Sequence, residues 1–241
     1  MQLLITLQKE QIRLPIATSE VLQGLIYYAI SSDKDYSTKV HDEGLTSSNR
    51  SFKAFTFGEL KGKYEIEGKE IIYLSAVSLE VRSEDAYFIQ LLFEYFSNNK
   101  LVKLGYNEVE VVSVELKNEV IFDDEVRIRT LSPITVYATD ESGHTLYYSP
   151  YESEFYSAVV ANVCRKWQSY YGTDDGFDFS ITPDGSKFIK RATRYKNTFI
   201  TAWHGKFLLQ GSPKVLSFLY NTGLGSKNSQ GFGMFEVVEK T

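Results

Sequence analysis

The order of the predicted strands and helices is the feature that most constrains the fold of this chain. Residues 2–8 predict a strand, and residues 18–30 predict a helix with Leu22, Leu25, Ile26 and Ala29 on one face. The elements expected next are a strand over 52–57, a hairpin over 64–78, a helix that follows residues 83–85 and runs to 97, and a strand over 109–116. The first half therefore has the order β-α-β-β-α-β.

The second half repeats this plan. Strands are expected over 126–130, 134–138 and 145–148, followed by a helix over 150–171 with an apolar stripe at Phe155, Val159, Val163 and Trp167. The remaining elements are strands over 177–182, 187–196 and 199–210, a short helix over 213–220 and a last strand over 231–238.

Two successive β-α-β-β-α-β units predict an α+β protein made of two tandem ferredoxin-like domains. RNA-recognition folds share this plan, and the faces of their sheets can stack bases. We expect an N-terminal domain over residues 1–120 and a C-terminal domain over 121–241, with the boundary in the segment 118–124.

The charge of the chain is distributed unevenly. Its 241 residues carry a formal net charge of −5, which taken alone argues weakly against a nucleic-acid partner. Residues 185–241, however, contain nine Lys or Arg against two acids, a net charge of +7, whereas residues 1–184 carry −12. Such a division indicates one surface for an anionic partner, and the alternative is chance clustering on solvated strands.

Several classes of protein are excluded by composition. No apolar run reaches eighteen residues and the N-terminus lacks a basic segment before an apolar core, so we expect no membrane partner, no signal peptide and a cytoplasmic location. Cys164 is the single cysteine, which rules out an internal disulfide. Three histidines and one cysteine fit no usual zinc spacing, so no metal site and no cofactor are expected.

The most informative stretch is the glycine-rich run over residues 222–236. Its glycines permit positive φ and let backbone N–H groups approach a phosphate closely. Lys227 adds a positive charge, while Asn228 and Ser229 add hydrogen-bond donors. The run matches neither the phosphate-binding loop of nucleotide-binding proteins nor the dinucleotide-binding pattern. On the residues alone, a tight turn between helix and strand is an equally good interpretation.

The run over residues 223–234, GLGSKNSQGFGM, resembles the C-terminal glycine-rich loop of the CRISPR repeat-processing endoribonucleases. These enzymes are the sixth of the core CRISPR-associated proteins and belong to the repeat-associated RNA-binding superfamily. The resemblance extends in the right order over nearly the whole chain, through residues 22–30, 40–44, 52–57, 131–134 and 201–204. The glycine loop is common to the superfamily, whereas His41 and residues 52–55 point to the nuclease.

The resemblance implies metal-independent cleavage of CRISPR repeat RNA by attack of a 2′-hydroxyl, which leaves a 2′,3′-cyclic phosphate and a 5′-hydroxyl. This chemistry needs a base, an acid and a positive charge for the phosphorane. The family's tyrosine, histidine and lysine map onto Tyr27, His41 and Lys53. Tyr27 is expected to position groups or act as an acid, because a tyrosine pKa near 10 makes a poor base. Either Tyr27 or its neighbour Tyr28 faces the site.

His41 is expected in a polar loop or a short helix, whereas His144 and His204 are interpreted as structural. The basic segment over residues 187–196 predicts an RNA-binding strand, because basic side chains interleaved with aromatics suit phosphates and unstacked bases; the alternative is a strand edge protected by lysines. The expected RNA-binding residues are Lys187, Lys190, Arg191, Arg194, Gly223, Gly225, Lys227, Asn228, Ser229, Gly231 and Gly233, with Lys196 completing the basic segment.

Two further interpretations stay open. The chain is alternatively a non-catalytic repeat-RNA-binding subunit of a CRISPR effector complex, although such a subunit has no need for His41 together with Lys53. A generic RNA-recognition-like module fits the fold but leaves the glycine run unexplained. The expected partners are CRISPR repeat RNA and, left open by the sequence, other effector subunits and a second copy of the chain.

Overall fold

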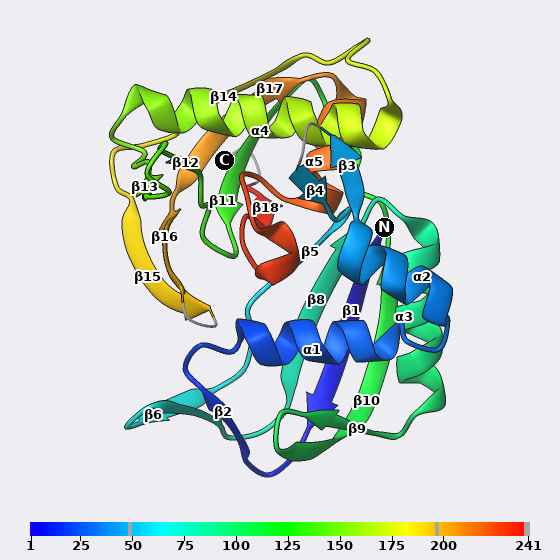
Figure 1. The fold of residues 1–241 in the computed structure, drawn as a ribbon. Helices are drawn as coiled ribbons and strands as arrows, with labels where there is room; N and C mark the ends of the chain where they lie inside the picture. The colour runs from blue at the N-terminus through cyan, green and yellow to red at the C-terminus, as the bar shows by residue number, and fades with distance from the viewer. Residues whose placement is uncertain (48–49, 196–197, 239–241) are drawn as a thin grey trace.

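The computed structural model describes residues 1–47, 50–195 and 198–238. The N-terminal half is built on an antiparallel sheet with the strand order β5-β8-β1-β10-β9. Its elements in chain order are β1 (Gln2–Gln8), α1 (Ser19–Ala29), β5 (Phe55–Phe57), β8 (Val77–Ser83), α3 (Ala86–Asn98), β9 (Leu101–Leu104) and β10 (Asn107–Lys117). The strands other than the added edge strand β9 have the order of a ferredoxin-like domain, with the first and third strands at the centre (Figure 1).

The C-terminal half has the same topology. Its sheet has the order β14-β17-β11-β18 and all its pairs are antiparallel. The elements are β11 (Glu125–Thr130), α4 (Ser153–Tyr171), β14 (Phe179–Pro183), β17 (Lys206–Gly211), α5 (Pro213–Thr222) and β18 (Phe235–Val237). The chain is therefore an α+β protein with two tandem ferredoxin-like halves, as predicted. The boundary between residues 120 and 121 stays a prediction; it falls in the connection between β10 and β11.

Smaller hairpins and short helices extend from the two sheets. The additional strands are β2 (Ile12–Pro15), β3 (Leu45–Ser47), β4 (Arg50–Phe52), β6 (Tyr64–Glu67), β7 (Glu70–Tyr73), β12 (Tyr137–Thr139), β13 (Thr145–Tyr147), β15 (Ile189–Tyr195) and β16 (Thr198–His204). The short helices are α2 (Lys34–Thr38), the π-helix η1 (Lys39–Glu43) and the 3₁₀-helix η2 (Asn228–Gln230). Figure 1 shows the long curved hairpin β15–β16 at the side of the C-terminal half.

The strand predicted over 199–210 is two strands. It breaks at Gly205, and the two parts belong to different sheets: β16 pairs with β15, whereas β17 enters the main sheet. A Cβ at Gly205 would lie 2.5 Å from the ring of Phe188, so the close approach of that ring requires glycine at the break. The last strand is also shorter than predicted, because residues 223–234 form a folded loop before β18.

The apolar faces predicted for two helices are confirmed. Leu22, Leu25, Ile26 and Ala29 of α1 are buried in the N-terminal core, and the α4 stripe of Phe155, Val159, Val163 and Trp167 is buried in the C-terminal core. The other faces of these helices are left to solvent or to a cleft between the halves. None of the helices in the described ranges is long and apolar enough to cross a membrane.

A buried arginine joins the two halves. Arg82 of β8 donates to the main-chain oxygen of Phe235 at 2.7 Å, and its guanidinium lies 3.6 Å from the ring centroid of Tyr220. Glu80, two residues earlier on the same strand, accepts a hydrogen bond from Nε of Arg82 at 2.6 Å. A buried charge is tolerated when it is paired and hydrogen-bonded in this way. The halves therefore meet through specific polar contacts.

Candidate functional site

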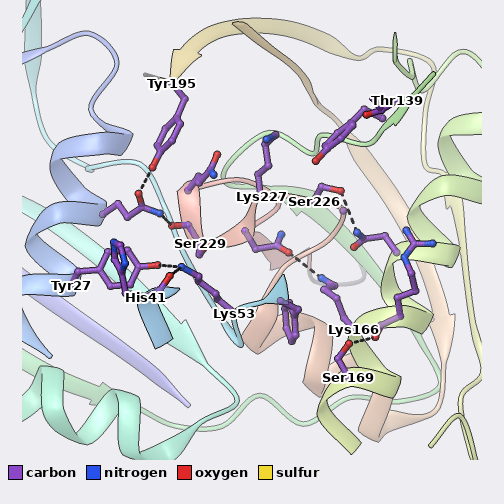
Figure 2. Close-up of a pocket in the computed structure, with 18 residues that line it drawn as sticks. Tyr27, His41, Lys53, Thr139, Lys166, Ser169, Tyr195, Ser226, Lys227 and Ser229 are labelled. Atoms are coloured by element: carbon purple, nitrogen blue, oxygen red, sulfur yellow. Dashed lines mark hydrogen bonds between the residues drawn. The ribbon is translucent and has the colours of Figure 1, made fainter. Parts of the chain in front are cut away.

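Tyr27, His41 and Lys53 lie together, although they come from three separate elements. Tyr27 is on α1, His41 is in η1, and Lys53 is in the break between β4 and β5. The Lys53 ammonium donates to the Tyr27 hydroxyl at 2.9 Å and also to the main-chain oxygen of His41. The rings of Tyr27 and His41 meet edge to face with centroids 4.8 Å apart. Figure 2 shows the three residues on one side of a cleft.

The exposure of the two adjacent tyrosines, Tyr27 and Tyr28, shows which of them faces the cleft. Tyr27 is half-buried and lines the cleft, whereas Tyr28 is 66% exposed and packs against Tyr95 on another side of α1. Successive helical residues point about 100° apart, so only one of two neighbours can face a given site.

The position of His41 depends on the helix before it. Asp33 begins α2 by accepting the main-chain N–H of Tyr36 at 3.0 Å. The hydroxyl of Tyr36 donates to Asp85 at 2.6 Å, and burial together with this carboxylate raises the pKa of Tyr36 well above its usual range. Tyr36 therefore stays protonated and ties α2 to the start of α3, and η1 continues from α2 to present His41.

The cleft beside these residues has a volume of about 660 Å³ and is lined by both halves of the protein. Gln23, Tyr27, His41 and Lys53 line it from the N-terminal half, and α4, β12 and the glycine-rich loop line it from the C-terminal half. Among the described residues, every ionic side chain of the lining is basic: Lys53, Arg165, Lys166 and Lys227, in addition to His41. Although the chain has a net negative charge, the described lining of the cleft contains no acidic side chain. A lining of this kind suits an anionic ligand.

The glycines of the loop are required by the fold of the loop itself. Gly223, Gly225, Gly231 and Gly233 are all buried and all have positive φ. At Gly225 (φ 68°) an added Cβ would lie 2.7 Å from the main-chain oxygen of Thr135, and at Gly233 (φ 76°) it would lie 1.9 Å from that of Leu224. No side chain fits at these distances, so the tight-turn interpretation accounts for these two positions.

The side chain of Asn228 lines the cleft but makes its hydrogen bonds inside the loop. It is 5% exposed, and its amide nitrogen donates to the main-chain oxygens of Leu224 and Phe232. Its Oδ1 accepts from Lys166 at 3.1 Å. These contacts hold the loop together, and a role of Asn228 in RNA binding stays a prediction. The loop residues that line the cleft with partly exposed side chains are Ser226, Lys227, Ser229 and Gln230.

Helix α4 contributes a wall of the cleft that the sequence interpretation missed. Asn162, Arg165, Lys166 and Ser169 line the cleft from this helix. Their spacing places them on one side of α4, next to its apolar stripe. That spacing is the only signal in the sequence, and it cannot be distinguished from an ordinary solvated face. Figure 2 shows Lys166 and Ser169 across the cleft from Tyr27 and His41.

The basic residues of the hairpin β15–β16 lie apart from the cleft, and their side chains point to two faces. Lys190 pairs with Trp203 and Arg194 with Phe199, whereas Arg191 pairs with Ala202. Because side chains alternate along a strand, Lys190 and Arg194 share one face and Arg191 has the other. The first face also carries Phe199, which is 72% exposed. Lys187 is exposed just before β15, and Lys196 lies outside the described residues.

The end of the hairpin contacts helix α1. The hydroxyl of Tyr195 hydrogen-bonds the side-chain oxygen of Gln23, and the side-chain nitrogen of Gln23 donates to the main-chain oxygen of Ser229. Gln23 lies one helical turn before Tyr27. The hairpin, the glycine-rich loop and the helix that carries Tyr27 are therefore linked.

The other two histidines lie away from this group. His144 is exposed in the turn between β12 and β13, where Asp140 accepts its main-chain N–H. His204 ends β16, and its Nδ1 lies 3.1 Å from the hydroxyl of Thr130. Burial and the charge of Arg191 lower the pKa of His204. Within the described parts of the chain, no three His, Cys, Asp or Glu side chains are grouped so that they could hold a metal ion.

Comparison with known proteins gives a consistent result. Residues 116–237 match the sequence profile of the family described as CRISPR associated protein Cas6, C-terminal. A protein of Methanocaldococcus jannaschii named CRISPR-associated endoribonuclease Cas6 1 is 27% identical over 238 residues, covering 90% of this chain and 85% of its own. The Pyrococcus furiosus protein named CRISPR-associated endoribonuclease Cas6 is 27% identical over 236 residues, covering 93% and 84%.

A solved structure described as a RAMP protein binding different RNA substrates has the same fold. It is 22% identical and superposes with a TM-score of 0.84, covering 99% of this chain and all of its own. At this identity the similarity establishes the fold, and it agrees with the two tandem ferredoxin-like halves described above.

Proposed function

The chain belongs to the CRISPR-associated Cas6 family, and on this premise we propose that it is an endoribonuclease that cleaves CRISPR precursor RNA within its repeats. One observation carries the proposal: Tyr27, His41 and Lys53 meet at a cleft whose ionic side chains, among the described residues, are all basic. The family's named relatives are endoribonucleases, and the grouping of these residues supports the same activity here.

We assign the reaction to attack by a ribose 2′-hydroxyl on the adjacent phosphate. The new bond joins the 2′-oxygen to phosphorus, and the bond from phosphorus to the 5′-oxygen of the next nucleotide breaks. One proton leaves the 2′-hydroxyl and one is delivered to the departing 5′-oxygen. The products are a 2′,3′-cyclic phosphate and a 5′-hydroxyl.

Each residue of the group has a distinct proposed role. An imidazole can accept and donate a proton near neutral pH, so His41 is the proton-transfer residue: it takes the proton from the 2′-hydroxyl and returns one to the departing 5′-oxygen. The ammonium of Lys53 offsets the charge that develops on the phosphorane. The hydroxyl of Tyr27 accepts a hydrogen bond from that ammonium, so Tyr27 orients Lys53 and, through its ring, supports His41. Every step is supplied by side chains, so the proposed reaction is metal-independent.

The RNA strand is proposed to lie in the cleft and continue onto the hairpin β15–β16. Ser226, Lys227 and Ser229 are the loop residues placed to contact its backbone, and Lys227 lies 5.2 Å from the ring centroid of Tyr137. The glycines and Asn228 act indirectly by giving the loop its shape. Lys187, Lys190 and Arg194 are proposed to extend the phosphate path, and exposed Phe199 offers a ring for base stacking.

Cleavage in the presence of a chelator tests the proposal. Repeat RNA labelled at its 5′ end is incubated with the protein in EDTA, and the products are sized and their termini identified. We expect a single cut, a cyclic phosphate on the upstream fragment, and binding without cleavage when the nucleotide upstream of the cut is 2′-deoxy. Cleavage that requires a divalent ion, or a cut at the deoxy position, would overturn the mechanism.

The same experiment addresses the second candidate function, a non-catalytic repeat-RNA-binding subunit of an effector complex. That function predicts tight binding of repeat RNA with no cleavage under any of these conditions. Association with effector subunits or with a second copy of the chain, and a cytoplasmic location, stay predictions.

A further inference from the structure

A lysine is buried in the wall of the cleft, and none of the described residues that line this cleft brings it a carboxylate. Lys166 of α4 is 4% exposed, and its ammonium donates to the main-chain oxygen of Gly223 and to Oδ1 of Asn228. Its nitrogen also lies 5.5 Å from the ring centroid of Phe52, the residue before Lys53. Both oxygens and the ring are uncharged, so these contacts pair two N–H donors of Lys166 without neutralising its charge.

Among the described residues, the other Lys and Arg side chains that line the cleft come from three elements. Helix α4 contributes Arg165, the glycine-rich loop contributes Lys227, and the break between β4 and β5 contributes Lys53. None of the described residues that line the cleft is an Asp or a Glu. This lining therefore offers the Lys166 ammonium no carboxylate to offset its burial.

Burial disfavours the charged form of Lys166. Desolvation lowers the pKa of Lys166 to about 7, because transfer from water penalises the charged form. The neutral amine is well accommodated, since it still has two N–H donors for its two acceptors, Gly223 O and Asn228 Oδ1. Near neutral pH the empty cleft therefore contains Lys166 in both protonation states.

An RNA backbone changes this balance, because it brings several negative charges into the cleft. We propose that Lys166 takes up a proton when RNA enters the cleft, so that RNA binding and protonation of this buried lysine are coupled. The inference rests on the proposed function, which places RNA in this cleft. The ammonium is produced where the glycine-rich loop meets α4, and it strengthens the loop's hydrogen bonds because charged donors bond more strongly than neutral ones.

The direction of the coupling sets the pH dependence of binding. RNA stabilises the protonated form, so affinity is greatest at low pH and falls as the pH rises above the value at which free Lys166 loses its proton. One linked proton has a limiting effect of about tenfold in Kd per pH unit. The effect adds to the salt dependence that the phosphate contacts produce.

Calorimetry measures how many protons the protein takes up when it binds RNA. Repeat RNA with a 2′-deoxy nucleotide upstream of the cut is titrated into the protein at pH 8 in two buffers with different heats of ionisation, such as Tris and Hepes. The difference between the two binding enthalpies gives the number of protons taken up. The proteins compared are the wild type, Lys166→Met, which keeps most of the length of the side chain and removes its amine, and His41→Asn, which removes the imidazole that lines the cleft. Lys103→Met controls for removal of an exposed lysine on β9.

We expect proton uptake in the wild type, in Lys103→Met and in His41→Asn, and its loss in Lys166→Met. Tight binding by the wild type with no uptake would overturn the coupling and leave the proposed function standing. Uptake that disappears in His41→Asn would assign the proton to the imidazole and also overturn it. Absence of repeat-RNA binding would overturn both proposals. If Lys166→Met does not fold, the wild type and His41→Asn still decide between these outcomes.

Discussion

The ammonium nitrogen of Lys53 lies 2.9 Å from the hydroxyl oxygen of Tyr27, so a lysine between two short strands is tied to a helix that precedes it by 26 residues. The same ammonium donates to the main-chain oxygen of His41. The side-chain nitrogen of Lys53 thus contacts both other members of the group. It holds the site together as well as carrying charge.

Because Lys53 both carries charge and holds the site together, substitutions at Lys53 and Tyr27 should lower the cleavage rate to different extents. Lys53→Met should lower the single-turnover cleavage rate by about 10²–10³-fold, the usual effect of removing one group that stabilises transition-state charge. Tyr27→Phe keeps the ring against His41 and removes only the hydroxyl, so its effect should be smaller. Rapid-quench measurements with saturating enzyme give both rates. A greater reduction in Tyr27→Phe would make Tyr27 the proton donor.

His41→Ala should slow cleavage by about 10²–10⁴-fold, the range for a positioned general acid or base. Its affinity for repeat RNA should stay within a few-fold of wild type, because affinity arises from many contacts along the strand. His144→Ala is the matched control, since His144 is exposed in the turn between β12 and β13 and is not among the residues that line the cleft. Wild-type cleavage by His41→Ala would move the proton transfer to another residue, with Tyr27 tested first.

The two faces of β15 should differ in RNA binding. The double variant Lys190→Ala with Arg194→Ala removes two charges from the face that carries Phe199. Its plot of log Kd against log salt should be shallower by about 0.7 for each phosphate that the variant no longer neutralises, the value for single strands. Arg191→Ala alters the opposite face and should leave the slope unchanged. Equal slopes for all three proteins would place the RNA elsewhere.

Gly225→Ala should lower stability, because position 225 has φ 68° and an added methyl group would lie 2.7 Å from the Thr135 oxygen. A left-handed conformation alone costs a residue with a side chain about 1–2 kcal/mol. Ser226→Ala changes a neighbour that lines the cleft and should affect RNA affinity more than the melting temperature. Thermal unfolding and Kd, measured on both variants, separate the two effects. A Gly225→Ala protein with wild-type melting temperature would contradict the argument.

Lys166 should also give the free protein a pH-dependent stability. Its pKa is about 7 in the folded protein and near 10.5 in the unfolded chain. Between these values the unfolded chain binds more protons, so the free energy of unfolding should rise with pH across this window. Lys166→Met should lack this rise. Urea unfolding at several pH values between 7 and 10 measures it, and identical pH profiles for the two proteins would show that Lys166 keeps its ordinary pKa.

Much of the fold can be predicted because it follows from local periodicity. The apolar stripes of α1 and α4, and the strands that alternate with helices, lie within single elements and are visible in the sequence. The residues at which strands begin and end are harder to predict from the sequence. The break at Gly205 depends on the ring of Phe188, which reaches the glycine from a separate segment of chain. Local pattern contains no information about such a contact.

The candidate site likewise has features that the sequence predicts and features that it does not. The grouping of Tyr27, His41 and Lys53 follows from resemblance, whereas the choice of Tyr27 over Tyr28 requires the orientation of α1. Lys166 escapes sequence reasoning because a lysine on a helix is usually solvated, and its burial results from contacts with Gly223 and Asn228, about sixty residues later. The hydrogen bonds of Asn228 inside the loop are hidden from the sequence for the same reason, because its partners are set by the tertiary fold.

All three catalytic candidates precede residue 60, yet the helix that carries Tyr27 is held by Tyr195 and Ser229 through Gln23. The candidate site therefore depends on contacts from both halves of the protein. A fragment that ends near residue 120 would retain all three catalytic candidates and the strands of the first sheet. It would lack the far wall of the cleft and the contacts that fix α1. Two halves of the same topology thus have different parts in the candidate site: one carries the catalytic candidates, and the other contacts the helix that positions Tyr27.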